Sequence, residues 1–85
     1  MNRLKELRTK MGLTQVNVQL KTGIDQSDYS KMELGKRGFT FGQAIRLALL
    51  FDTSIDYLIG MTDEKRPYPR SKKYINLDKF DIRDK

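Results

Sequence analysis

The sequence predicts an all-α fold: a compact bundle of five short helices followed by a basic C-terminal tail. Three observations predict this fold. Apolar residues recur at helical spacing, a polar residue able to cap a helix precedes each later apolar stretch, and a glycine follows four of the five stretches. With short connections, the helices fill residues 1–60 as one domain, and residues 61–85 form the tail.

The first helix is predicted over residues 2–11. Leu4, Leu7 and Met11 recur there at i, i+3 and i+7 between charged residues, which makes one apolar stripe on an amphipathic helix. Gly12 is expected to end this helix.

The second helix is predicted to begin after Thr14, a favoured N-cap residue, and to run to about Thr22. Gly23 follows, and glycine can adopt the left-handed conformation that a tight turn between helices requires. We therefore expect a sharp turn at Gly23.

The third helix is predicted over residues 26–34. Asp25 is its expected N-cap, Asp28 three residues later suggests an imperfect capping box, and Gly35 ends the helix. Two short helices joined by a glycine-containing turn form the unit that sets a recognition helix in the major groove of DNA.

Thr40 is expected to cap the fourth helix, which is apolar over more than half its circumference and should be central or shared with a partner. Ser54 caps a short fifth helix over residues 54–59, and Gly60 ends it. Seven large side chains are expected to point into the core: Tyr29, Met32, Phe41, Leu47, Phe51, Tyr57 and Leu58.

The composition favours a polyanionic partner and argues against catalysis. The chain has 17 Lys and Arg against 11 Asp and Glu, a formal charge of +6. Cysteine and histidine are absent, which excludes disulfides, thiolate zinc sites, thiol nucleophiles and the commonest general base. We expect no enzyme activity, no metal and no cofactor. No apolar run approaches the roughly 18 residues of a membrane span, so we expect a cytoplasmic protein.

Four strings in order carry a resemblance to a known family: LKELRTKMGLTQ, TGID, YSKMELGKR and SIDYLIG. Together they resemble the helix-turn-helix proteins of the Cro and phage-repressor type, also called the XRE family. The resemblance implies a lambda-repressor-like bundle whose third helix reads the major groove of double-stranded DNA. It also implies a homodimer on a pseudo-palindromic operator.

The resemblance assigns roles to individual residues. Gln15 would meet a phosphate, and Arg8 and Glu33 would form a structural ion pair. Gln26, Ser27 and Ser30 would face base edges. The cations that would bind the DNA backbone or adjoining bases are Lys31, Lys36 and Arg37.

The chemistry of these residue types agrees with the roles. A Gln amide matches adenine N6 and N7 together, and Lys or Arg neutralises phosphates and releases counterions. The carboxylate of Asp28 would repel phosphate, although it could accept a hydrogen bond from cytosine N4. We therefore expect Asp28 to cap its own helix rather than to contact a base.

Some positions depart from the family pattern. Gln19 stands where the family usually has a small Ala, so its side chain must turn outward or open the crossing of the two helices. Val16 and Leu20 occupy positions that are usually polar. Asp52 replaces a turn glycine, which is tolerable because Asp visits the left-handed region.

A dimer contact is expected where apolar residues extend beyond the inward face of the fourth helix and towards the tail, at Leu49, Leu50, Ile59 and Met61. Pro67 and Pro69 predict an extended or mobile start of the tail. The string KKYINL would either pair as an edge strand between protomers or fold back on its own domain.

The predicted function is a sequence-specific DNA-binding transcriptional regulator, a repressor or Cro-like protein. The alternative is a protein-interaction module of the same fold, such as an antitoxin or adaptor, which Val16, Leu20 and the apolar tail favour. RNA binding is weaker, because the chain lacks an interleaved aromatic platform for single-stranded bases.

Overall fold

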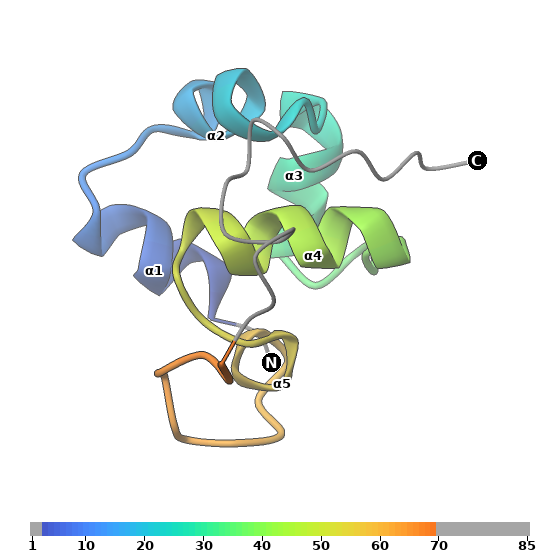
Figure 1. Ribbon diagram of the computed structural model, residues 1–85. Helices are drawn as coiled ribbons and strands as arrows, with labels where there is room; N and C mark the ends of the chain where they lie inside the picture. Colours follow the sequence, from blue (N-terminus) through green and yellow to red (C-terminus); the bar gives the residue numbers. More distant parts are fainter. Residues whose placement is uncertain (1–2, 70–85) are drawn as a thin grey trace.

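Five α-helices make up the described part of the chain, residues 3–69 of this computed structural model, and no strand occurs within that part (Figure 1). This confirms the predicted all-α fold. None of these helices is long and apolar enough to span a membrane. The helices are α1 (Leu4–Lys10), α2 (Gln15–Thr22), α3 (Gln26–Glu33), α4 (Phe41–Leu50) and α5 (Ile55–Leu58).

The predicted N-caps of α2, α4 and α5 are confirmed. The Thr14 hydroxyl accepts the Asn17 N–H, and the Asn17 side chain accepts the Thr14 N–H in return. Thr40 and Gln43 form the same reciprocal capping box at α4, while the Ser54 hydroxyl accepts the Tyr57 N–H at α5. Each box satisfies two backbone donors that have no partner within the helix.

The start of α3 differs from the expectation. The Asp25 carboxylate caps the helix by accepting the Ser27 N–H at 3.1 Å, as predicted. Asp28, however, does not complete a capping box, because its Oδ1 lies 2.8 Å from a guanidinium nitrogen of Arg37. The loop after α3 brings Arg37 back to the first turn of that helix. Asp28 therefore binds the Arg37 guanidinium instead of a backbone N–H.

Two turns depend on left-handed backbone. Gly23 ends α2 with φ of 77°, and its N–H donates to the Gln19 carbonyl at 2.8 Å. Asp52, between α4 and α5, has φ of 51°, as expected of an Asp in the place of a turn glycine.

The core lies between α2, α3 and α4, with α1 packed against α3 and α5 against α4. In Figure 1, α4 crosses the view below α2 and in front of the lower end of α3. Burial of each large aliphatic side chain contributes about 1.5–3 kcal/mol. The buried cluster comprises Leu4, Leu7, Val18, Ile24, Tyr29, Met32, Leu47, Ala48, Phe51 and Leu58.

Phe41 corrects the predicted core. Its side chain is 72% exposed, although it was expected to point inward. Phe41 is the first residue of α4, directly after the Thr40 cap, and the inward face of that helix is formed by Ala44, Leu47 and Ala48. Tyr57 is partly buried and packs against the cluster, while the other five predicted core residues are buried.

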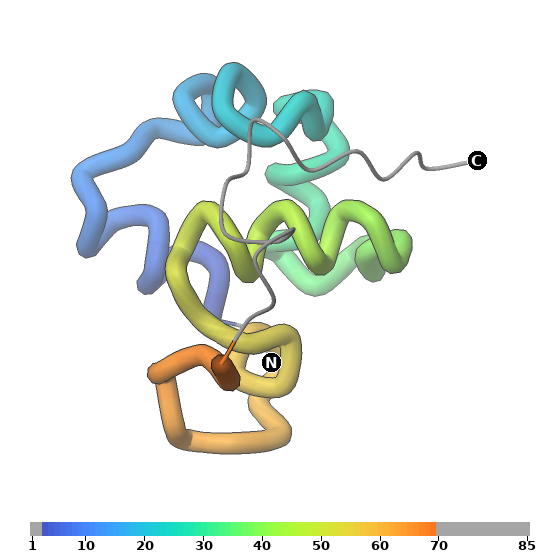
Figure 2. Tube along the Cα trace, in the orientation of Figure 1, coloured from blue at the N-terminus to red at the C-terminus, as the bar shows by residue number. Residues whose placement is uncertain are grey.

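Residues 61–69 leave α5 without helical structure and pass along the end of the bundle (Figure 2). Arg3 binds this segment. Its guanidinium donates to the Thr62 carbonyl at 2.6 Å, lies 2.7 Å from the Asp63 carboxylate and stacks 3.9 Å above the centre of the Tyr57 ring. One side chain therefore joins the start of the described chain to the segment that follows α5. The expected strand pairing of KKYINL falls outside the described residues.

Candidate nucleic-acid interface

The α3 helix has one face buried in the core and one face exposed to solvent. Tyr29 and Met32 are fully buried in the core. The opposite face is polar: Gln26, Ser27 and Lys31 are exposed, and Ser30 is half-buried. Four of the residues expected to meet DNA therefore lie together on one uncovered face of a single helix.

A network of hydrogen bonds holds the C-terminal end of α3 at Glu33. Arg8 Nε donates to Glu33 Oε2 at 2.6 Å, and a second guanidinium nitrogen donates to Oε1 at 3.2 Å. The two side chains are 13% and 5% exposed. A third guanidinium bond reaches the Leu13 carbonyl at 2.9 Å. The expected pair of Arg8 and Glu33 is in contact, and it fixes the end of α3 to α1.

The Glu33 carboxylate also receives a bond from α2. Gln15 Nε2 donates to Glu33 Oε1 at 3.1 Å. Burial alone would raise the pKa of Glu33, but the hydrogen bonds, chiefly from Arg8, lower it below its ordinary value of 4.5. Gln15 thus helps to position α3 in this structure, and its contact with a phosphate stays a prediction.

The cations of the interface differ in their surroundings. Arg37 is paired with Asp28, so part of its charge is already neutralised. Lys31 and Lys36 are exposed and form no salt bridge to any residue between 3 and 69. Within residues 3–69 these two lysines therefore differ from Arg37, and their contact with phosphates stays a prediction.

Gln19 contributes a contact that the sequence prediction missed. Its side chain turns outward, one of the two outcomes expected for a long residue at that position, and its Oε1 accepts the Gln26 N–H at 2.7 Å. The departure from a small residue was the available signal. Nothing in the sequence indicated the partner.

Comparison with known proteins agrees with this geometry. The profile of the helix-turn-helix family matches residues 4–58. The chain belongs to the XRE-type helix-turn-helix family. It is also 35% identical over 78 residues to the "Uncharacterized HTH-type transcriptional regulator YobD" of Bacillus subtilis (strain 168), covering 92% of this chain and 67% of that protein. No solved structure matches the chain.

Membership of this helix-turn-helix family makes the chain a DNA-binding regulator rather than an enzyme. Among residues 3–69, no three His, Cys, Asp or Glu side chains gather into a group that could hold a metal ion.

The four residues expected at a dimer contact differ in their surroundings. Leu50 packs against the core. Leu49 instead lines an apolar groove, and Ile59 and Met61 are exposed beyond α5. Leu49 and Leu50 are neighbours in sequence, so α4 turns them about 100° apart, and only one can join the groove.

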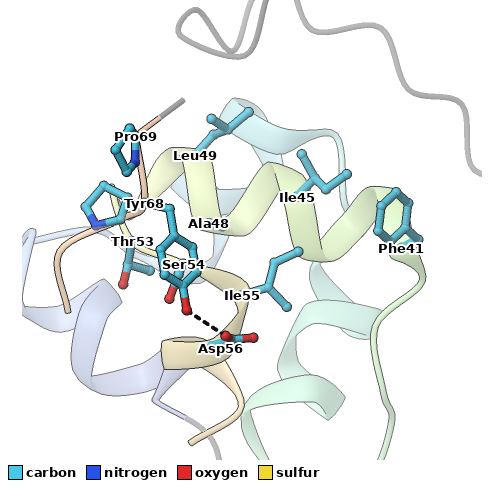
Figure 3. Close-up of a pocket in the computed structure, with 11 residues that line it drawn as sticks. Phe41, Ile45, Ala48, Leu49, Thr53, Ser54, Ile55, Asp56, Tyr68 and Pro69 are labelled. Atoms are coloured by element: carbon cyan, nitrogen blue, oxygen red, sulfur yellow. Dashed lines mark hydrogen bonds between the residues drawn. The ribbon is translucent and has the colours of Figure 1, made fainter. Parts of the chain in front are cut away.

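The groove has a volume of about 560 Å³ and lies between α4, α5 and residues 67–69 (Figure 3). Its floor contains the α4 stripe of Phe41, Ile45 and Leu49, with Ile55 from α5. The Tyr68 hydroxyl donates to Asp56 Oδ2 at 3.0 Å and forms one wall. Phe41 was expected in the core, and here it extends the apolar face of α4 towards solvent.

Proposed function

We propose that the protein regulates transcription, as a repressor or Cro-like regulator, by reading the major groove of a specific DNA sequence with the outward face of α3. The observation that carries this proposal is the polar, uncovered face of a helix whose other side is buried. The Arg8–Glu33 pair supports it, because a reading helix must be held rigidly for base contacts to discriminate.

Each side chain takes a role that its chemistry allows. Gln26, in the first turn of α3, pairs through its amide with an adenine edge. The hydroxyls of Ser27 and Ser30 bond to bases nearby. Lys31 and Lys36 neutralise phosphates.

We further propose that the protein binds a pseudo-palindromic operator as a homodimer. One domain of this size reaches about one half-site, and specific affinity normally needs two half-sites a helical turn apart. Leu49 in the apolar groove, together with the exposed side chains of Ile59 and Met61, offers apolar surface for the twofold contact. Leu50 supports this surface from the core side.

Selection of bound sites from a randomised duplex pool tests the proposal. The unsubstituted protein should enrich a two-fold repeated sequence. Gln26→Ala should relax the preference at one position of each half-site and leave the salt dependence nearly unchanged. Lys36→Ala should weaken binding to all sequences alike and reduce the salt slope by about one. Identical behaviour of the two variants would contradict the assignment.

A second candidate function is a protein-interaction module. Val16 and Leu20 lie four residues apart on α2 and are 47% and 77% exposed, which gives that helix an apolar outer edge. Titration against random duplex at low and high salt separates the two functions, since only DNA binding weakens steeply as salt rises.

A further inference from the structure

The side chain of Gln19 forms a bridge between the two helices that flank the turn. Its Oε1, on the last turns of α2, accepts the N–H of Gln26, the first residue of α3, at 2.7 Å. Both residues are exposed, so the bond lies outside the core and buries no apolar surface. Its effect is to fix the first turn of α3 relative to α2.

This bond complements the cap of α3. The first N–H groups of a helix have no partner within it. Asp25 satisfies the Ser27 N–H, whereas the Gln26 N–H receives its acceptor from Gln19, seven residues earlier. The residue proposed to read a base is therefore held at its backbone by a side chain of the other helix.

We infer that Gln19 is a specificity-determining positioning residue, which orients Gln26 towards its base pair. The inference rests on the proposed function, in which Gln26 pairs with an adenine edge. A bidentate pairing needs both amide groups aligned with both base groups, and misalignment of the helical turn that carries the amide weakens both bonds.

The expected effect is a loss of base discrimination. A good bidentate contact discriminates against a wrong base by roughly 5- to 150-fold. Gln19→Ala should lose most of this factor at the same base pair that Gln26→Ala affects. In the double variant the loss should not exceed that of Gln26→Ala alone, because one contact can be lost only once.

The experiment measures dissociation constants of full-length variants for the selected operator and for a duplex changed at the base pair read by Gln26. Gln19→Glu keeps an acceptor oxygen at the same reach, so it should retain the preference while its negative charge weakens binding to both duplexes. Gln43→Ala is the matched control. Gln43 also accepts a backbone N–H at a helix start, that of Thr40 at 2.9 Å, but on α4, so the preference should be unchanged.

A second readout needs no DNA. Hydrogen exchange of the backbone N–H of Gln26 should be faster in Gln19→Ala than in the unsubstituted protein. In Gln43→Ala it should be accelerated far less. Unchanged exchange would overturn the bridge in solution.

The outcomes separate this inference from the proposed function. If Gln26→Ala abolishes the preference but Gln19→Ala keeps it, or weakens both duplexes equally, the positioning role is wrong and the proposed function stands. If the unsubstituted protein prefers no sequence, the proposed function fails, and the inference fails with it.

Discussion

The Glu33 carboxylate of α3 connects three helices, because it accepts hydrogen bonds from Arg8 of α1 and from Gln15 of α2. The pair of Arg8 and Glu33 was expected from the family resemblance, because the family's structural ion pair maps to these two positions. The bond from Gln15 was not expected. It depends on the direction of a side chain, which the three helices set only after they pack.

Removing one partner of the Arg8–Glu33 pair should destabilise the fold more than removing both. A stranded buried charge costs about 3–5 kcal/mol, and less where water reaches it, as the 13% exposure of Arg8 allows. Denaturant unfolding of Arg8→Met, Glu33→Leu and the double variant measures this. Strictly additive losses would show that the two side chains do not interact.

The same carboxylate makes stability depend on pH. Because the pKa of Glu33 is lowered in the fold, the folded state holds fewer protons than the unfolded state as pH falls below its ordinary value of 4.5. Its stabilising contribution is thus complete above that pH and is lost as pH falls through the lowered value. Acid titration of the unfolding free energy should be steeper for the natural protein than for Glu33→Gln. Equal slopes would exclude this contribution.

At the scale of elements, caps and turns were predictable and the contacts between elements were not. Thr14, Thr40 and Ser54 act within three residues, so sequence spacing alone indicates them. Asp28 was assigned to its own helix by the same reasoning and bonds instead to Arg37, nine positions away. A local rule cannot detect a partner that the following loop brings back.

The Asp28–Arg37 pair should restrain DNA affinity. Asp28→Asn removes a negative charge beside α3 and frees the Arg37 guanidinium for a phosphate. Affinity for every duplex should therefore rise, and the salt slope should steepen by about one. A filter-binding titration over several salt concentrations measures both quantities. Unchanged affinity and slope would mean that Arg37 stays away from the DNA. Glu64→Gln is a suitable control, since Glu64 is exposed and pairs with Arg66 in the segment after α5.

At the scale of the whole molecule, sequence reasoning did not predict the contact between Arg3 and the segment that follows α5. Arg3 and Asp63 are sixty positions apart, and neither belongs to an apolar pattern. No helix follows α5 in residues 61–69, while the domain boundary after Gly60 stays a prediction. Yet Thr62 and Asp63 are bound to Arg3, so the segment begins as part of the bundle surface.

Arg3→Met should lower stability by about 1–3 kcal/mol, because it removes the carbonyl bonds and the stacking on Tyr57 while keeping an apolar stem. Asp63→Asn should have almost no effect, since Asp63 is fully exposed and surface pairs contribute little. Thermal unfolding compares them. A large loss in Asp63→Asn, or none in Arg3→Met, would contradict the dominance of the carbonyl and ring contacts.

Assembly of two protomers is the last expectation at this scale. In an isologous interface each substitution occurs twice, so replacing Leu49 and Ile59 by Ser should weaken dimerisation about tenfold or more. Sedimentation with a palindromic duplex should show two protomers of the natural protein bound to one duplex. For the double variant, complexes with a single protomer should persist to higher protein concentration. Met11→Ser, which changes an exposed apolar residue at the end of α1, should assemble normally. A natural protein that stays at one copy per palindrome at saturation would refute the homodimer, and normal assembly of the double variant would show that the contact does not involve Leu49 and Ile59.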